Sequence, residues 1–157
     1  MTLFLLGIFI PPLYSQESEF EKSTLLMNQV EDLNRQGRYA EAIPVAEQIV
    51  AINEKALGTD HPDIVGSLSW LAFLYQNDGD DKKAESIYRR AIAICETYKQ
   101  TTGQDHPDMA TLLKNLSWIY RKHGNHTEAD NLYKKGLQTE FEILDRMSNL
   151  MEQRRPK

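Results

Sequence analysis

Two histidine-proline-aspartate triplets are the residues of this chain whose types and spacing could do chemistry. His61-Pro62-Asp63 returns further along as His106-Pro107-Asp108. An imidazole two residues before a carboxylate could act as an acid–base pair or supply two ligands to a metal ion. His123 and His126 flank an expected turn, and Cys95 is the one cysteine of the sequence.

Helix formation also explains the two triplets. Proline suits the first turn of a helix, where no backbone N–H is needed, and the aspartate that follows favours the positive end of the helix dipole. His61 or Asp60 would cap the helix. His61 and His106 would then lie one repeat apart, which is too far to share an ion. We therefore interpret both triplets as helix starts.

The sequence contains no other sign of catalysis. The eight glycines are scattered and form no phosphate-binding loop. No carboxylate or cysteine accompanies His123 and His126 at the spacing of a metal site. Cys95 ends the apolar run Ala91–Cys95, so we expect a buried core thiol. The chain is expected to be no enzyme and to bind no metal and no cofactor.

The sequence repeats itself with a period of 45 residues. Besides the two triplets, Tyr75, Gly79, Ala84 and Tyr88 return as Tyr120, Gly124, Ala129 and Tyr133. A fainter copy lies 42 residues upstream, where Gly37 and Ala42 match Gly79 and Ala84. Such a period is the signature of a solenoid, in which each unit buries its apolar face by stacking on its neighbours.

Each unit reads as a helical hairpin. Apolar residues recur at helical spacing on both sides of a short glycine-containing turn, which forces the two helices to lie antiparallel. In the second and third units the stripes are Leu68, Leu71, Ala72, Leu74, Tyr75, then Ala84, Ile87, Tyr88, Ala91, Ile92, Cys95; and Leu112, Leu113, Leu116, Ile119, Tyr120, then Ala129, Leu132, Tyr133, Leu137. Ala84 and Ala129 are small where the two helices of a hairpin would cross closely.

The two ends of the stack are less regular. In the first unit we expect Leu25, Leu26, Val30 and Leu33 on one helix, and Tyr39, Ala42, Ile43, Ala46, Ile49, Val50 and Leu57 on the other. Pro44 lies early enough in that second helix to be tolerated. The last helix should run from about Thr127 to about Met151, because its apolar spacing continues and no glycine or proline intervenes. It would cap the stack or offer an apolar face to a partner.

Composition bounds the remaining possibilities. The chain has 157 residues and a formal net charge of −5, which gives no reason to expect nucleic acid as a partner. Residues 1–17 form an apolar segment, and residues 1–15 within it resemble a secretory signal. Two features depart from such a signal: no Lys or Arg precedes the apolar run, and Leu13 is bulky near the expected cleavage site. A disordered or membrane-touching tail, or a misassigned start, is the alternative, so localisation stays open between export and the cytoplasm. No segment is long enough to span a membrane.

Residues 57–91 resemble a tetratricopeptide repeat. Leu57-Gly58-Thr59-Asp60-His61-Pro62-Asp63, followed by Tyr75, Gly79, Ala84, Tyr88 and Arg89-Arg90-Ala91, is similar to the variety of about 42 residues found in kinesin light chains. The resemblance extends over about residues 25–137. It implies an all-α, right-handed α-solenoid of about three antiparallel helix pairs with an extended last helix. The expected limits are a domain over residues 18–152, repeats at about 23–57, 62–102 and 107–144, and a basic tail over 153–157.

The resemblance also implies a concave groove, lined by the first helix of each pair, that binds a peptide of a partner protein. The residues that match the groove positions are Asn34, Ser69, Phe73, Gln76, Asn77, Lys114, Asn115, Trp118 and Arg121. Phe73, Trp118 and Trp70 could instead pack between units. Positions at which relatives clamp a terminal carboxylate hold Met27, Glu31, Trp70, Thr111 and Asn115, so that mode of binding is not expected. Lys114 and Arg121 favour an acidic segment.

Two other functions remain open from the sequence. The last helix could pair with a second copy through Phe141, Leu144 and Met151, which would make the chain a self-associating structural unit. The chain could also be part of a larger repeat protein, since the bare end of a stack exposes apolar surface.

Overall fold

The structure, a computed structural model, describes the backbone of residues 13–154 and the side chains of residues 22–154. The signal-like residues 1–12 and the end of the basic tail, 155–157, lie outside the described residues. The elements in chain order are α1 (Leu13–Arg35), α2 (Tyr39–Leu57), the short 3₁₀ helix η1 (Pro62–Ile64), α3 (Val65–Asp78), α4 (Asp81–Thr102), α5 (Met109–Lys122) and α6 (His126–Gln153).

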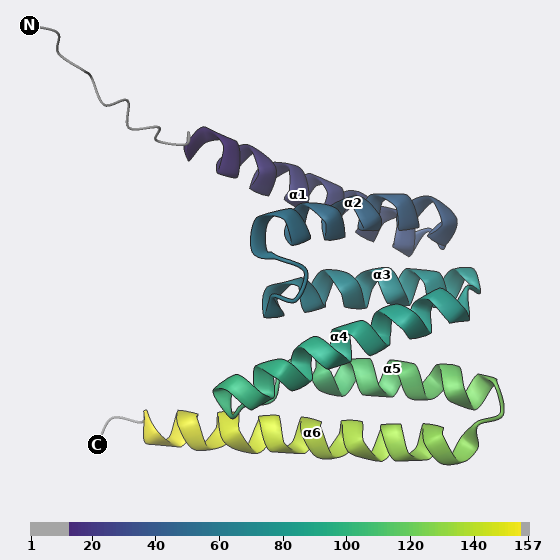
Figure 1. Cartoon of the computed structure of the whole chain (residues 1–157), viewed down its shortest axis with the longest axis vertical. Helices are drawn as coiled ribbons and strands as arrows, with labels where there is room; N and C mark the ends of the chain where they lie inside the picture. The colour runs from purple at the N-terminus through teal and green to yellow at the C-terminus, as the bar shows by residue number, and fades with distance from the viewer. Residues whose placement is uncertain (1–12, 155–157) are drawn as a thin grey trace, which may run out of the picture.

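The helices form three stacked hairpins. Each helix packs against the one that follows it, and α1 and α2 lie at one end of the stack while α5 and α6 lie at the other (Figure 1). Within residues 13–154 there is no β-strand. The expected all-α solenoid of helix pairs is confirmed. We call α1 with α2, α3 with α4, and α5 with α6 the first, second and third units.

The turns follow from their glycines. Gly79 closes α3 with φ 93° and ψ 1°, the left-handed conformation that glycine adopts without steric cost, and its N–H bonds to the carbonyls of Gln76 and Tyr75. Gly103 ends α4 in the same way, with φ 71°. The second hairpin therefore reverses within a few residues at Gly79 and its helices run antiparallel, whereas Gly103 ends α4 at the connector to the third unit.

The two histidine triplets start helices. The Nδ1 atom of His61 accepts a hydrogen bond from the backbone N–H of Asp63 at 3.2 Å, and His106 accepts one from Asp108 at the same distance. Pro62 occupies the first turn of η1. Among the residues that the structure describes, no three His, Cys, Asp or Glu side chains gather closely enough to hold a metal ion.

Small residues let the helices of a hairpin approach. Ala84 and Ala129 are fully buried. Gly136 takes the place that Ala91 has in the second unit, and a Cβ atom there would lie 3.1 Å from the carbonyl oxygen of Ala110 and 3.0 Å from the Cγ of Lys114. Helices α5 and α6 therefore meet at a point where even a methyl group would require a shift.

Four residues expected in the core are exposed. Leu25 is 69% exposed and Leu57 44%, because Leu25 lies on the outer side of the first helix and Leu57 ends α2 at the connector. Tyr133 and Leu137 are each 44% exposed, because no described helix covers the end of the stack at α6. The hydrophobic pattern placed all four on apolar stripes, but burial there needs a neighbouring unit.

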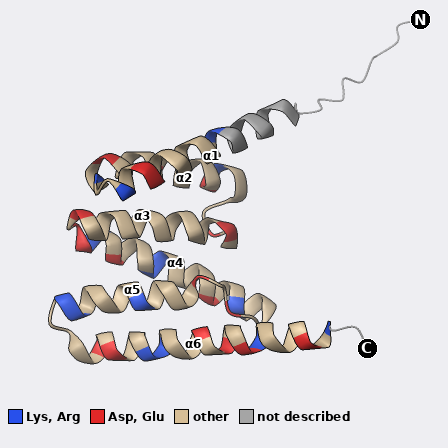
Figure 2. Ribbon diagram, turned by 180° about the vertical axis from the view of Figure 1, so that it is seen from behind, with Lys and Arg blue, Asp and Glu red and all other residues tan. Residues whose placement is uncertain are grey.

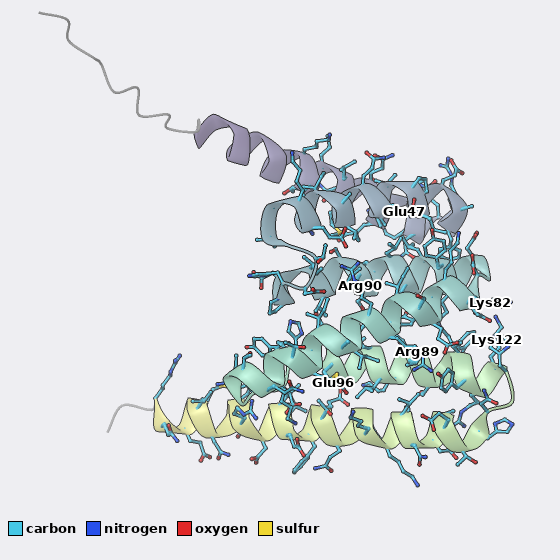
Figure 3. All side chains as sticks on the ribbon, viewed as in Figure 1. Glu47, Lys82, Arg89, Arg90, Glu96 and Lys122 are labelled. Atoms are coloured by element: carbon cyan, nitrogen blue, oxygen red, sulfur yellow. The ribbon has the colours of Figure 1, made fainter. Side chains whose placement is uncertain are left out.

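Polar side chains tie each unit to the next. Between the first and second units, the hydroxyl of Tyr75 donates to Glu47 and Arg90 pairs with Glu54 at 2.6 Å. Between the second and third, Lys122 and His123 contact Asp81 at 2.6 and 2.9 Å. Figure 3 labels Glu47, Arg90 and Lys122 among the side chains of the stacked helices.

The last helix extends beyond its partner. Helix α6 has 28 residues against 14 in α5, in agreement with the expected long final helix. Large apolar side chains on its second half are exposed: Phe141 66%, Leu144 60%, Met147 50%, Leu150 49% and Met151 63%. The stripe therefore has no partner within the described chain. None of the described helices combines the length and the apolar character that crossing a membrane requires.

Candidate peptide-binding groove and end face

A hollow of about 350 Å³ is lined by the first helices of all three units. We call it the groove hollow. The third unit contributes through Asp108, which directly precedes α5, and through Thr111 on α5. Its lining residues are Asn34, Gly66, Ser69, Trp70, Phe73, Asp108 and Thr111. Each unit therefore supplies at least one side chain to one concave site.

Two aromatic rings form the apolar wall of the groove hollow. Trp70 and Phe73 stand three residues apart on α3, so they project from nearly the same side of the helix. Their centroids are 5.9 Å apart and their planes meet at 84°, an edge-to-face contact. Both are partly exposed. The rings therefore present a fixed apolar surface to a side chain entering the hollow.

Polar groups surround these rings. Asn34, Ser69 and Thr111 offer donors and acceptors that can pair with the backbone of an extended peptide. Asp108 adds a carboxylate whose side chain is 44% exposed. Gly66 lies beside Asp108, because a Cβ atom built at this glycine would lie 3.9 Å from the Oδ2 atom of Asp108.

Three of the groove residues predicted from the sequence meet in this hollow: Asn34, Ser69 and Phe73. Three others are engaged elsewhere. Gln76 accepts a hydrogen bond from the hydroxyl of Tyr88 at 3.0 Å, Asn115 bonds to the same tyrosine, and Asn77 donates to the carbonyl of Phe73 at 2.7 Å.

Lys114, Trp118 and Arg121 do not line the groove hollow. They line a second hollow of about 360 Å³, together with Ser117 and with Tyr133 of α6. We call it the end hollow, because it lies on the last unit of the stack. Lys114 contacts both carboxylate oxygens of Glu140 at 3.2 Å, and Arg121 pairs with Asp130. Lys122 stands 5.4 Å above the ring of Trp118. The predicted groove is therefore split between two separate hollows.

Sequence reasoning missed Gly66 and Asp108 as parts of the groove. Asp108 was interpreted as a helix-dipole residue, and Thr111 was considered for carboxylate clamping alone. Trp70 was considered for the groove and then assigned to packing. The sequence could have placed Trp70 in the groove, because Trp70 lies three residues before Phe73 and this spacing puts the two rings on one side of α3. Nothing in the spacing places Asp108 beside Gly66, since that contact joins two units.

Burial shifts the pKa of two tyrosines outside the groove hollow. Desolvation raises the pKa of Tyr88, and the bond to Asn115 opposes part of that rise. Desolvation, followed by the hydrogen bond to Glu47, raises the pKa of Tyr75 to about 12. Both hydroxyls therefore stay protonated near neutral pH and act as hydrogen-bond donors between helices.

Charges are also arranged at the end of the stack. Figure 2 shows Lys and Arg at the end of α5 and both signs of charge along α6. Burial alone would raise the pKa of Asp81, but its hydrogen bonds to Lys122 and His123 outweigh burial and hold the pKa below its ordinary value of 3.8. Asp81 is therefore a charged link between α4 and the end of α5.

Comparisons with known proteins agree with this geometry. A tetratricopeptide repeat family model matches residues 21–97 and again residues 63–139. A search of curated proteins found no match. Two solved structures of nearly identical TPR-like repeats, assigned to a kinesin light chain of Podosopora anserina, superpose with TM-scores of 0.64 and 0.63; the second is a variant with one residue substituted.

Each of these two structures is 25% identical in sequence to the chain and covers 78% of it. The chain in turn spans 57% of each solved chain. The two matches of the family model together cover residues 21–139, which leaves out the start of α1 and the second half of α6. The chain belongs to the tetratricopeptide repeat family, in the form similar to the repeats of kinesin light chains.

Proposed function

We propose that the chain is a non-catalytic interaction module that binds an extended peptide segment of a partner protein in the groove hollow. Tetratricopeptide repeats generally mediate protein–protein interaction. The observation that supports the proposal here is the convergence of three first helices on one concave site with two aromatic rings and several polar side chains. Aromatic anchors surrounded by polar groups are typical of the residues that dominate interface energies.

The lining indicates the chemistry of the peptide. An apolar side chain of the partner would pack on Trp70 and Phe73, while Asn34, Ser69 and Thr111 pair with its backbone. The carboxylate of Asp108 would accept a hydrogen bond from a peptide N–H or from a basic side chain. An acidic segment suits the groove hollow poorly, because Asp108 would repel it. Lys114 and Arg121, the residues that favoured an acidic segment, lie at the end hollow and already pair with Glu140 and Asp130.

Selection of short random peptides on the wild-type protein tests this proposal. Enriched peptides are measured by calorimetry against the wild type, Phe73→Ala and a matched control, Leu25→Ala, whose side chain is exposed away from the groove hollow. We expect Phe73→Ala to lower the affinity about tenfold or more and Leu25→Ala to leave it unchanged. Peptides that bind both variants as tightly as the wild type would remove the groove hollow as the site.

A second candidate function is self-association through α6. The exposed stripe on its second half, which contains Phe141, Leu144 and Met151, supports this alternative. Light scattering during size-exclusion chromatography separates the two candidates. A dimer that becomes monomeric on Phe141→Glu with Leu144→Lys would support self-association, whereas a monomeric wild type would exclude it at the concentration tested.

A further inference from the structure

The third unit leaves open a face that the second unit covers. Tyr133 and Leu137 of α6 correspond, 45 residues on, to Tyr88 and Ile92 of α4. Tyr88 is fully buried, and its hydroxyl bonds to Gln76 and to Asn115 of the next unit. Tyr133 and Leu137 are each 44% exposed. We call the surface made by Lys114, Ser117, Trp118, Arg121, Tyr133 and Leu137 the end face.

The opposite end of the stack carries polar side chains at two positions that are apolar in the later units. Gln29 and Asp32 of α1 are exposed. The matching residues of α3 are Leu71 and Leu74, and those of α5 are Leu116 and Ile119, and all four are buried. The first unit therefore carries polar side chains where later units carry buried apolar ones. Helix α1 of a second copy would bring Gln29 and Asp32 onto the end face, which makes it a poor occupant.

The second unit shows what an occupant of such a face looks like. Helix α5 lies on the corresponding face of α3 and α4 and is an amphipathic helix. Its buried residues include Leu112, Leu116 and Ile119, and the hydroxyl of Tyr120 donates to Glu85 of α4 at 2.8 Å. The end of α5 contacts a carboxylate of α4, because Lys122 and the following His123 lie 2.6 and 2.9 Å from Asp81.

The charges on the end face differ from this internal template. His126 stands where α4 has Asp81, so the acidic group of the template is lost, whereas Lys134 keeps the positive charge of Arg89. Asp130 corresponds to Glu85 and is already paired with Arg121. The first turn of α6 thus offers an imidazole in place of the buried carboxylate that contacts the end of α5. Because that carboxylate is missing and Lys134 is a cation, acidic side chains suit the last turn of an arriving helix better than basic ones.

We propose that the end face docks an amphipathic helix of a partner protein, with an apolar stripe like that of α5 and acidic side chains in its last turn. This helix would run parallel to α5, as α5 does to α3 (Figure 1). It would cover Tyr133 and Leu137 as α5 covers Tyr88, and its acidic end would meet His126 and Lys134. The proposal is independent of the groove hollow, since the two surfaces share no residue.

Synthetic peptides with the sequence of residues 107–125 provide a defined probe. One peptide keeps the sequence of this chain, a second carries Lys122→Glu and His123→Glu, and a third adds Leu116→Asp and Ile119→Asp to the second. Each is labelled with fluorescein and stabilised as a helix by a lactam bridge on its solvent face, because isolated helices of this length are marginal. Fluorescence anisotropy measures binding to the full chain. We expect the second peptide to bind about tenfold more tightly than the first, and the third not to bind.

Variants of the full chain locate the site. Tyr133→Glu with Leu137→Glu should weaken binding of the second peptide about tenfold or more, whereas Phe73→Ala should not change it. If circular dichroism shows that the double variant is not folded, Tyr133→Ala with Leu137→Ala replaces it. Equal binding to the end-face variant overturns the proposal, and so does tighter binding of the first peptide than of the second. A wild-type dimer that this variant converts to a monomer would also overturn it, because a second copy would then cover the end face.

Discussion

Tyr88 and Tyr133 occupy the same position in consecutive repeats, but Tyr88 is fully buried whereas Tyr133 is 44% exposed. The difference comes from the neighbouring unit. Helix α5 lies over Tyr88, and its Asn115 bonds to the tyrosine hydroxyl, while no described helix lies over Tyr133. The burial of a residue in this fold is therefore set by its place in the stack as much as by its side chain.

Truncating the two tyrosines should have unequal effects on stability. Tyr88→Ala should lower the free energy of unfolding by about 3–5 kcal/mol, because it opens a cavity and leaves Gln76 and Asn115 without their shared partner. Tyr133→Ala should cost about 1 kcal/mol or less, because nearly half of its side chain already faces water. Urea unfolding followed by circular dichroism measures both. Equal losses would contradict the inference that α5 covers one tyrosine and nothing covers the other.

Enlarging a fully buried alanine should destabilise the second unit. Ala84→Leu inserts three carbon atoms where α3 and α4 cross, and we expect a loss of about 1–3 kcal/mol in the free energy of unfolding through overpacking. Ser86→Leu is the matched control, because Ser86 lies on the exposed side of the same helix. An unchanged thermal midpoint for Ala84→Leu would show that the hairpin has room at this crossing.

Asp81 should make the stack sensitive to acid. Its pKa in the folded chain lies below the ordinary value of 3.8, because the hydrogen bonds to Lys122 and His123 outweigh burial. The ionised carboxylate therefore contributes stability at every pH above 3.8, and that contribution is lost as the pH falls through the lower, folded-state pKa. Asp81→Asn should cost about 1–3 kcal/mol near neutral pH, and the difference from the wild type should shrink in acid.

Urea unfolding at several pH values between about 7 and about 2.5 tests the role of Asp81. Asp60→Asn is the control, because Asp60 is exposed in the connector between two hairpins. A gap between Asp81→Asn and the wild type that stays constant across the series would mean that the charge of Asp81 contributes nothing, and that the variant acts through packing alone.

The helices and turns were predictable because they are local. The period of 45 residues, the glycines at the turns and the apolar stripes define each hairpin without reference to distant contacts. His61 was predicted as one of two possible caps, and the hydrogen bond from Asp63 assigns that role to it. The long last helix also follows from an uninterrupted pattern. These features need information from one unit at a time.

The division of the groove into two hollows was not predictable in the same way. Asn34, Ser69 and Phe73 converge because three units stack, whereas Lys114 and Arg121 are drawn to Glu140 and Asp130 on α6. A pattern of matching positions treats all units as equivalent. The third unit is not equivalent, because no described helix follows α6, so its first helix contributes mainly to the end face. Which predicted residues share a site therefore depends on the contacts between units, and in the third unit on the lack of a described neighbour beyond α6.

Cys95 should resist thiol reagents while the chain is folded. The side chain is 1% exposed, and desolvation, with smaller effects from Asp108 and Glu96, raises its pKa to about 12. At pH 7 the reactive thiolate is then present in on the order of one molecule in 10⁵. We expect a maleimide reagent to modify the native chain at the rate at which the stack opens, and to modify it at once in urea. Ser86→Cys, exposed on the same helix, supplies the rate for an accessible thiol. Labelling of Cys95 as fast as that control in the absence of urea would show that the thiol is not packed in the core. It would thereby contradict the close packing of α4 against its neighbours, on which the stacking depends.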